Sequence, residues 1–143
     1  FKSGILCRRF VSMDAGELDM GHVFAFLSVE AAYSHGTEWL DQCLAYIQGN
    51  IDFVDEFLKK HAPKIKAIRP EASYLVWLDC RELELSQKDL NEFFVDKAHL
   101  ALNDGEMFGK EGIGFMRLNV ASPRCIIEKA MKQLADAYQL YIK

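Results

Sequence analysis

Arg117 is the residue whose type and setting point most directly to chemistry. It lies in the run Phe115-Met116-Arg117-Leu118-Asn119-Val120, and side chains alternate between the two faces of a strand. Met116, Leu118 and Val120 then form an apolar core face, while Phe115, Arg117 and Asn119 share the other face. A guanidinium fixed on a strand can bind a carboxylate through two hydrogen bonds. The alternative is a structural ion pair with a nearby Asp or Glu, and on spacing alone the two have about equal weight.

Other reactive residues form no recognisable site. The four histidines are far apart in the sequence and none has a metal ligand at the usual spacing; they are His22, His35, His61 and His99. The sequence contains no nucleophile elbow and no phosphate-binding glycine loop. The four cysteines, Cys7, Cys43, Cys80 and Cys125, form no C-x-x-C pair, which favours reduced, mostly buried thiols in a cytosolic protein.

The elements that must position Arg117 can be predicted from periodicity and from turn residues. The predicted helices are 21–35, 37–61, one opened by a capping box at Ser86-Gln87-Lys88-Asp89, and one opened by Ser122-Pro123. The predicted strands are 64–68, 73–79, 99–103 and 115–120, of which the first two form a hairpin and the second is buried on both faces. A loop at 104–114 holds four glycines. This order predicts an α+β fold, a mostly antiparallel sheet with helices packed on one face. We find no sequence reason for Gly49 inside a helix.

Composition limits the class of protein. The 143 residues are 50% apolar with a formal charge of −4, which predicts one folded domain and disfavours nucleic acid as a partner. No apolar run approaches the roughly 18 residues of a membrane span, so we expect no membrane partner. The chain begins at Phe1 without methionine, and we expect a piece of a longer protein. Residues 1–20 would be a connector or a remnant of a preceding large domain, and 21–143 a C-terminal small domain.

Three segments resemble one enzyme family. They are Pro70-Glu71-Ala72-Ser73-Tyr74-Leu75-Val76-Trp77-Leu78-Asp79, Leu102-Asn103-Asp104-Gly105 with Phe108-Gly109, and Gly114 to Arg124. They are similar to the C-terminal small domain of class I/II, fold type I, pyridoxal-phosphate-dependent aminotransferases. The Glu30-Ala31-Ala32-Tyr33 stretch and the residues from Gly36 to Leu40, followed by Tyr46 and Gly49-Asn50, resemble the cystathionine β-lyase-like carbon–sulfur lyases among them.

This resemblance implies that Arg117 grips the carboxylate of an amino-acid substrate, with Asn103 and Gly105 in a loop nearby. It implies pyridoxal 5'-phosphate as the cofactor of a homodimeric parent enzyme, and the cysteine pattern predicts a cytoplasmic location. Two departures stand out. Asp104 replaces the proline of the family's Asn-Pro-Gly turn, and no Schiff-base lysine in the family's setting is recognisable, so no residue here is assigned to catalysis, to the cofactor or to a metal.

We therefore expect a fragment of a pyridoxal-phosphate enzyme that acts on α-amino acids, a carbon–sulfur β-lyase first and an aminotransferase second. The fragment alone should be inactive. The alternative from another class is a non-catalytic α+β module for ligand binding or dimerisation, in which Arg117 is only a structural ion pair.

Overall fold

The computed structural model describes residues 22–142. The chain divides into two units, residues 1–41 and 42–143. The predicted connector at 1–20 and Cys7 lie outside the described residues, and the predicted domain boundaries stay a prediction.

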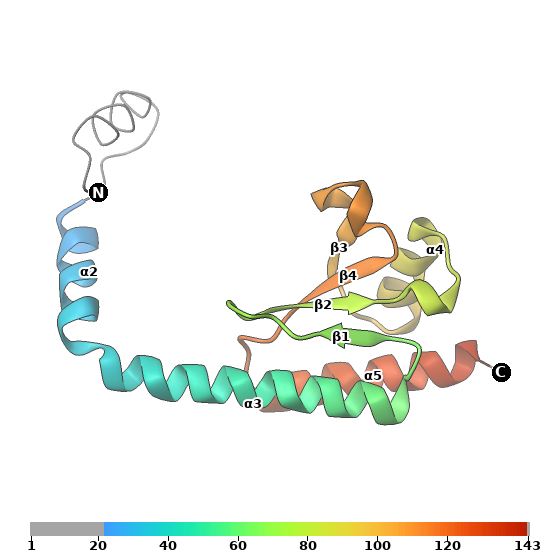
Figure 1. Cartoon of the computed structure of the whole chain (residues 1–143), viewed down its shortest axis with the longest axis horizontal. Helices are drawn as coiled ribbons and strands as arrows, with labels where there is room; N and C mark the ends of the chain where they lie inside the picture. Colours follow the sequence, from blue (N-terminus) through green and yellow to red (C-terminus); the bar gives the residue numbers. More distant parts are fainter. Residues whose placement is uncertain (1–21, 143) are drawn as a thin grey trace. The chain divides into compact units, whose positions relative to one another are not determined.

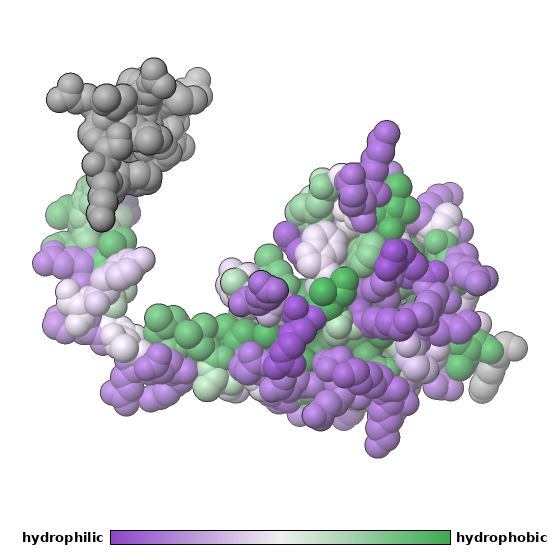
Figure 2. Space-filling model, viewed as in Figure 1, coloured by the Kyte–Doolittle hydropathy of each residue, from purple (hydrophilic) through white to green (hydrophobic). Residues whose placement is uncertain are grey.

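In the first unit, helix α2 spans Val23–His35. This helix ends as predicted at Gly36, whose N–H donates to the Ala32 carbonyl oxygen over 2.8 Å. None of its residues is buried. Large apolar side chains, including Phe24 and Phe26, stay more than 60% exposed and give α2 its green surface in Figure 2.

Helix α3, Thr37–His61, begins and ends where periodicity predicts. Its part in the second unit buries Ile51, Val54 and Leu58 along one stripe. The structure also accounts for Gly49. A Cβ atom at this position would lie 3.2 Å from Nη2 of Arg124, whose Nε donates to the buried Asn50 side chain over 2.8 Å. Glycine therefore leaves room for an arginine that links two helices.

The sheet has four antiparallel strands in the order β1-β2-β4-β3. They are β1 Lys66–Ile68, β2 Leu75–Asp79, β3 Asn103–Asp104 and β4 Phe115–Asn119. The predicted hairpin is confirmed because β1 pairs with β2. In Figure 1 helices α3 and α5 (Arg124–Tyr141) run along one side of the sheet.

The two central strands alternate strictly between faces. Val76, Leu78 and Met116 are fully buried and Leu118 is nearly so, which confirms the predicted core face of β4. On β2 the other positions, Leu75, Trp77 and Asp79, are only half-buried. The prediction that this strand is buried on both faces is therefore wrong, because only the face that carries Val76 and Leu78 belongs to the core.

Helix α4, Gln87–Glu92, begins with the predicted cap, in which the Asp89 N–H donates to the Ser86 hydroxyl. It continues as a π-helical turn, η2, Phe93–Lys97. A strand at 99–103 is wrong: His99 takes a left-handed φ of 54°, which breaks an extended run, and only Asn103–Asp104 pair.

The glycine-rich segment folds as two 3-10 turns, η3 Gly105–Phe108 and η4 Lys110–Gly112. A third short turn, η1 Arg81–Leu83, follows β2. Helix α5 begins one residue later than Ser122 predicts, with Pro123 at its N-cap and no side-chain cap. The predicted α+β class, with helices on one face of an antiparallel sheet, is confirmed.

The cysteines of the described residues are free thiols at three levels of exposure. Cys80 is buried, Cys43 is half-buried and Cys125 is exposed, so the prediction of mostly buried thiols is wrong for Cys125. Burial raises the pKa of the Cys80 thiol to about 12, which keeps it protonated and unreactive. Within residues 22–142, no helix combines the length and apolar character that crossing a bilayer requires.

Candidate functional site

One row of side chains crosses the open face of the sheet, the face away from the helices. Ile68 on β1 lies opposite Trp77 on β2. Trp77 in turn lies opposite Arg117 on β4, and Arg117 lies opposite Asn103 on β3. Alternation and register thus bring a cation, an amide and apolar surface together from residues that are far apart in the sequence.

Arg117 is half-buried and is held from two directions. Its guanidinium carbon lies 4.1 Å from the centre of the Phe108 ring, a cation–π contact. Its Nη2 donates to Oδ1 of Asn103 over 3.2 Å. The flat guanidinium is thereby given an orientation that a flexible surface arginine lacks.

No carboxylate of residues 22–142 forms an ion pair with Arg117. Its Nε is buried and has no hydrogen-bond partner in that part of the chain. A buried donor without a partner is unfavourable unless something else accepts from it. The structural ion pair that the sequence left open therefore has no partner among the described residues, so a carboxylate that pairs with this guanidinium has to come from outside residues 22–142.

A second arginine, Arg81, does have an acidic partner within the chain. Arg81 binds Asp79 with two hydrogen bonds, from Nε over 2.9 Å and from Nη2 over 2.7 Å. Its guanidinium also lies 4.9 Å from the Phe115 ring centre. The hydrogen bonds from Arg81 hold the pKa of the Asp79 carboxyl below its usual range and raise the pKa of Arg81. This charge is already matched within the chain.

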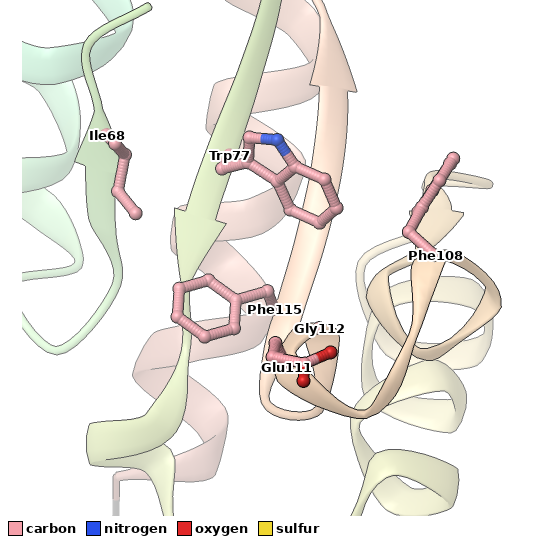
Figure 3. Close-up of a pocket in the computed structure, with 6 residues that line it drawn as sticks. All are labelled: Ile68, Trp77, Phe108, Glu111, Gly112 and Phe115. Atoms are coloured by element: carbon pink, nitrogen blue, oxygen red, sulfur yellow. The ribbon is translucent and has the colours of Figure 1, made fainter.

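An aromatic pocket of about 240 Å³ lies on the same face, as Figure 3 shows. Its lining residues are Ile68, Trp77, Phe108, Glu111, Gly112 and Phe115. Trp77 meets Phe108 and Phe115 edge to face, with ring centres 5.5 and 6.3 Å apart. Phe108 contacts both Trp77 and Arg117, so it is a shared wall between the pocket and the guanidinium.

The structure brings two of the three predicted site residues into contact. Asn103 bonds to Arg117. Gly105 is buried instead in the following turn, where a Cβ would collide with the backbone oxygen atoms of Gly112 and Phe115. Its place is therefore explained by close backbone approach.

Phe108 and Trp77 were missed as site residues by the sequence reasoning. Trp77 could have been found from strand alternation once the pairing of β2 with β4 was known. Phe108 had no such signal, because an aromatic residue in a glycine-rich loop gives no indication of which side chain it will cover. The residues 22–142 also contain no cluster of three groups suited to a metal ion.

Comparison with known proteins places this geometry in a family context. No model of a protein family matches the chain. It is 36% identical over 116 residues to cystathionine beta-lyase PatB of Bacillus subtilis. The aligned region covers 81% of this chain and 30% of PatB.

Two solved structures are similar over almost the whole chain. Cystalysin of Treponema denticola, a structure that contains pyridoxal 5'-phosphate, has a TM-score of 0.92 at 33% identity, covering 100% of this chain and 36% of cystalysin. A pyridoxal-phosphate-bound putative aminotransferase of Clostridium difficile has a TM-score of 0.82 at 35% identity, covering 94% of this chain and 34% of that one. This chain spans about a third of the length of such proteins. The resemblance is confirmed: the chain is related to the fold type I pyridoxal-phosphate enzymes and is similar to the C-terminal small domain of their cystathionine β-lyase-like branch.

Proposed function

We propose that this chain is the substrate-holding part of a pyridoxal-phosphate-dependent carbon–sulfur β-lyase that acts on α-amino acids. The observation that carries the proposal is Arg117, a guanidinium fixed by Phe108 and Asn103 with no carboxylate partner among the described residues. The relationship to PatB and cystalysin supports the class of reaction.

Arg117 would bind the α-carboxylate of the substrate. A planar guanidinium matches the two oxygen atoms of a carboxylate. Its position on β4 fixes the direction from which the substrate is held, so that the bond broken at Cα points consistently at the catalytic base. Asn103 would keep the guanidinium from rotating, and Phe108 would cover its face.

The described site does not itself fit the cofactor. Neither the pocket lining nor the contacts of Arg117 include a lysine amine. When bound elsewhere in the parent protein, pyridoxal phosphate supplies the electron-withdrawing group for chemistry at Cα. We assign no residue of this chain to it, and we expect the 143-residue chain alone to release no thiol from cystathionine when the cofactor is added.

The test is Arg117→Ala in the full-length parent enzyme, with cystathionine as substrate and thiol release as the readout. We expect kcat/KM to fall about 100-fold, or about 2.7 kcal/mol, as for loss of a charged hydrogen-bonded pair. Arg81→Ala is the matched control, because Arg81 is already paired with Asp79. Unchanged kinetics in Arg117→Ala would remove Arg117 from the site.

An aminotransferase is the second candidate, favoured by the similarity to the Clostridium difficile structure. Both reactions would use Arg117 in the same way. Incubation with cystathionine and a keto acid distinguishes them, since transfer of the amino group to the keto acid supports the aminotransferase and release of the thiol from cystathionine supports the lyase.

The setting of the parent protein belongs to the same proposal. The free thiols Cys43, Cys80 and Cys125 support the cytoplasm, where thiols stay reduced. The family relationship supports a homodimer, which light scattering of the full-length protein would test: a monomer mass would contradict it.

A further inference from the structure

The carboxylate of Asp104 accepts three hydrogen bonds, although Asp104 does not contact Arg117 through its side chain. Its Oδ1 accepts from Nε2 of Gln87 and from the Glu106 N–H, the latter over 2.8 Å. Its Oδ2 accepts from Nδ2 of Asn91. Both side-chain donors belong to helix α4, so the carboxylate ties the end of β3 to this helix.

The two residues of β3 point to opposite faces of the sheet. Asn103 lies opposite Arg117 on the open face, whereas Asp104 lies opposite the buried Met116. A strand of two residues at the edge of a sheet has few ladder hydrogen bonds to hold it. The Asp104 carboxylate therefore fixes from the core side a strand whose other residue supports the site.

Gln87 also links Asp104 to the strand that carries Arg117. Its Nε2 donates to Asp104, and its Oε1 accepts from the Gly114 N–H over 2.7 Å. Gly114 has a φ of 85° and directly precedes β4. One side chain of α4 thus connects the end of β3 with the beginning of β4.

We propose that Asp104 is a positioning residue for substrate binding. Through its contacts to Gln87 and Asn91 it keeps Asn103 beside Arg117, and so holds the guanidinium in the orientation that receives the substrate carboxylate. This inference rests on the proposed function of Arg117. It also gives a role to the residue that replaces the proline of the family's turn.

The test is Asp104→Asn in the full-length holoenzyme. The asparagine keeps the shape and one acceptor oxygen, but its amide meets the amide donor of Asn91 or Gln87. We expect KM to rise about tenfold, or about 1.4 kcal/mol, close to the lower end of what a hydrogen bond to a charged group contributes, with kcat changed less than about twofold. Asp52→Asn, on the exposed surface of α3 and paired with Arg69, is the matched control and should change neither.

Two inhibitors separate positioning from general loosening of the fold. L-methionine and the amine that remains when its carboxylate is removed differ only in the group that Arg117 would bind. Asp104→Asn should weaken inhibition by methionine about tenfold and leave inhibition by the amine unchanged. Equal weakening of both would overturn the proposal.

A double variant and a second single variant complete the test. Asp104→Asn with Asn91→Asp restores a donor–acceptor pair with its direction reversed, and should recover most of the methionine affinity. If Asp104→Asn fails to fold, Asn91→Leu removes only the donor to Oδ2 and should weaken methionine binding about threefold.

The outcome with Arg117→Ala separates this inference from the proposed function. If Arg117→Ala abolishes methionine binding but the folded variants of Asp104 and Asn91 leave it unchanged, the inference is overturned and the proposed function stands. No effect of Arg117→Ala would instead contradict the proposed function.

Discussion

Two arginines of the second unit, Arg81 and Arg117, both lie over a phenylalanine ring, but only one of them has an acidic partner among the described residues. Arg81 lies on the Phe115 ring and is bound by both oxygen atoms of Asp79. Arg117 lies on the Phe108 ring and is bound only by the amide oxygen of Asn103. The difference is one carboxylate. It teaches that an aromatic platform orients a guanidinium in both cases, and that the acidic partner decides whether the charge is available to a ligand.

The largest effect is expected from a variant that gives Arg117 an acidic partner, as Arg81 already has. Asn103→Asp places an acidic side chain where the amide oxygen already lies 3.2 Å from Nη2. The new ion pair should compete with the substrate carboxylate and raise KM about tenfold in the full-length enzyme, while the midpoint of thermal unfolding does not fall. Steady-state kinetics and a thermal melt of the same preparation measure both. A KM equal to that of the parent enzyme would show that Asn103 does not face the bound substrate.

Arg81→Ala sharpens the comparison from the other side. Because Arg81 is exposed and paired with Asp79, its loss should leave kcat/KM within about twofold of the parent value and lower the free energy of unfolding only slightly, as for exposed ion pairs generally. Kinetics with cystathionine and urea unfolding give the two numbers. A loss of activity as large as that of Arg117→Ala would mean that the paired arginine also binds substrate.

The smallest expected effect concerns acid stability. The hydrogen bonds from Arg81 lower the pKa of Asp79 in the folded chain, whereas an unfolded aspartate titrates near pH 3.9. The stabilisation is therefore present above that pH and is lost as the pH falls through the lower folded pKa. Asp79→Asn should show a shallower loss of stability below about pH 4, measured by urea unfolding across that range. An identical acid profile in both proteins would contradict the assignment.

The sequence allowed the side of β4 that carries Arg117 to be predicted, because alternation on a strand is a local rule and three buried positions obey it. It could not predict what Arg117 contacts. Phe108 and Asn103 reach it through strand register and loop closure, which depend on distant residues. The wrong strand at 99–103 has a similar cause, since the apolar residues there follow a π-helical turn and a left-handed His99 that local periodicity does not reveal.

Strand β4 has a neighbour on each side, whereas β3 is a two-residue edge strand. In hydrogen exchange, amides of interior strands open only with the whole fold, while edge segments open locally and far more often. We therefore expect the backbone that carries Arg117 and the backbone that carries Asn103 to open at different rates. The amides of β4 should exchange only when the second unit unfolds, and the amides of β3 should exchange at the rate at which this edge strand opens locally.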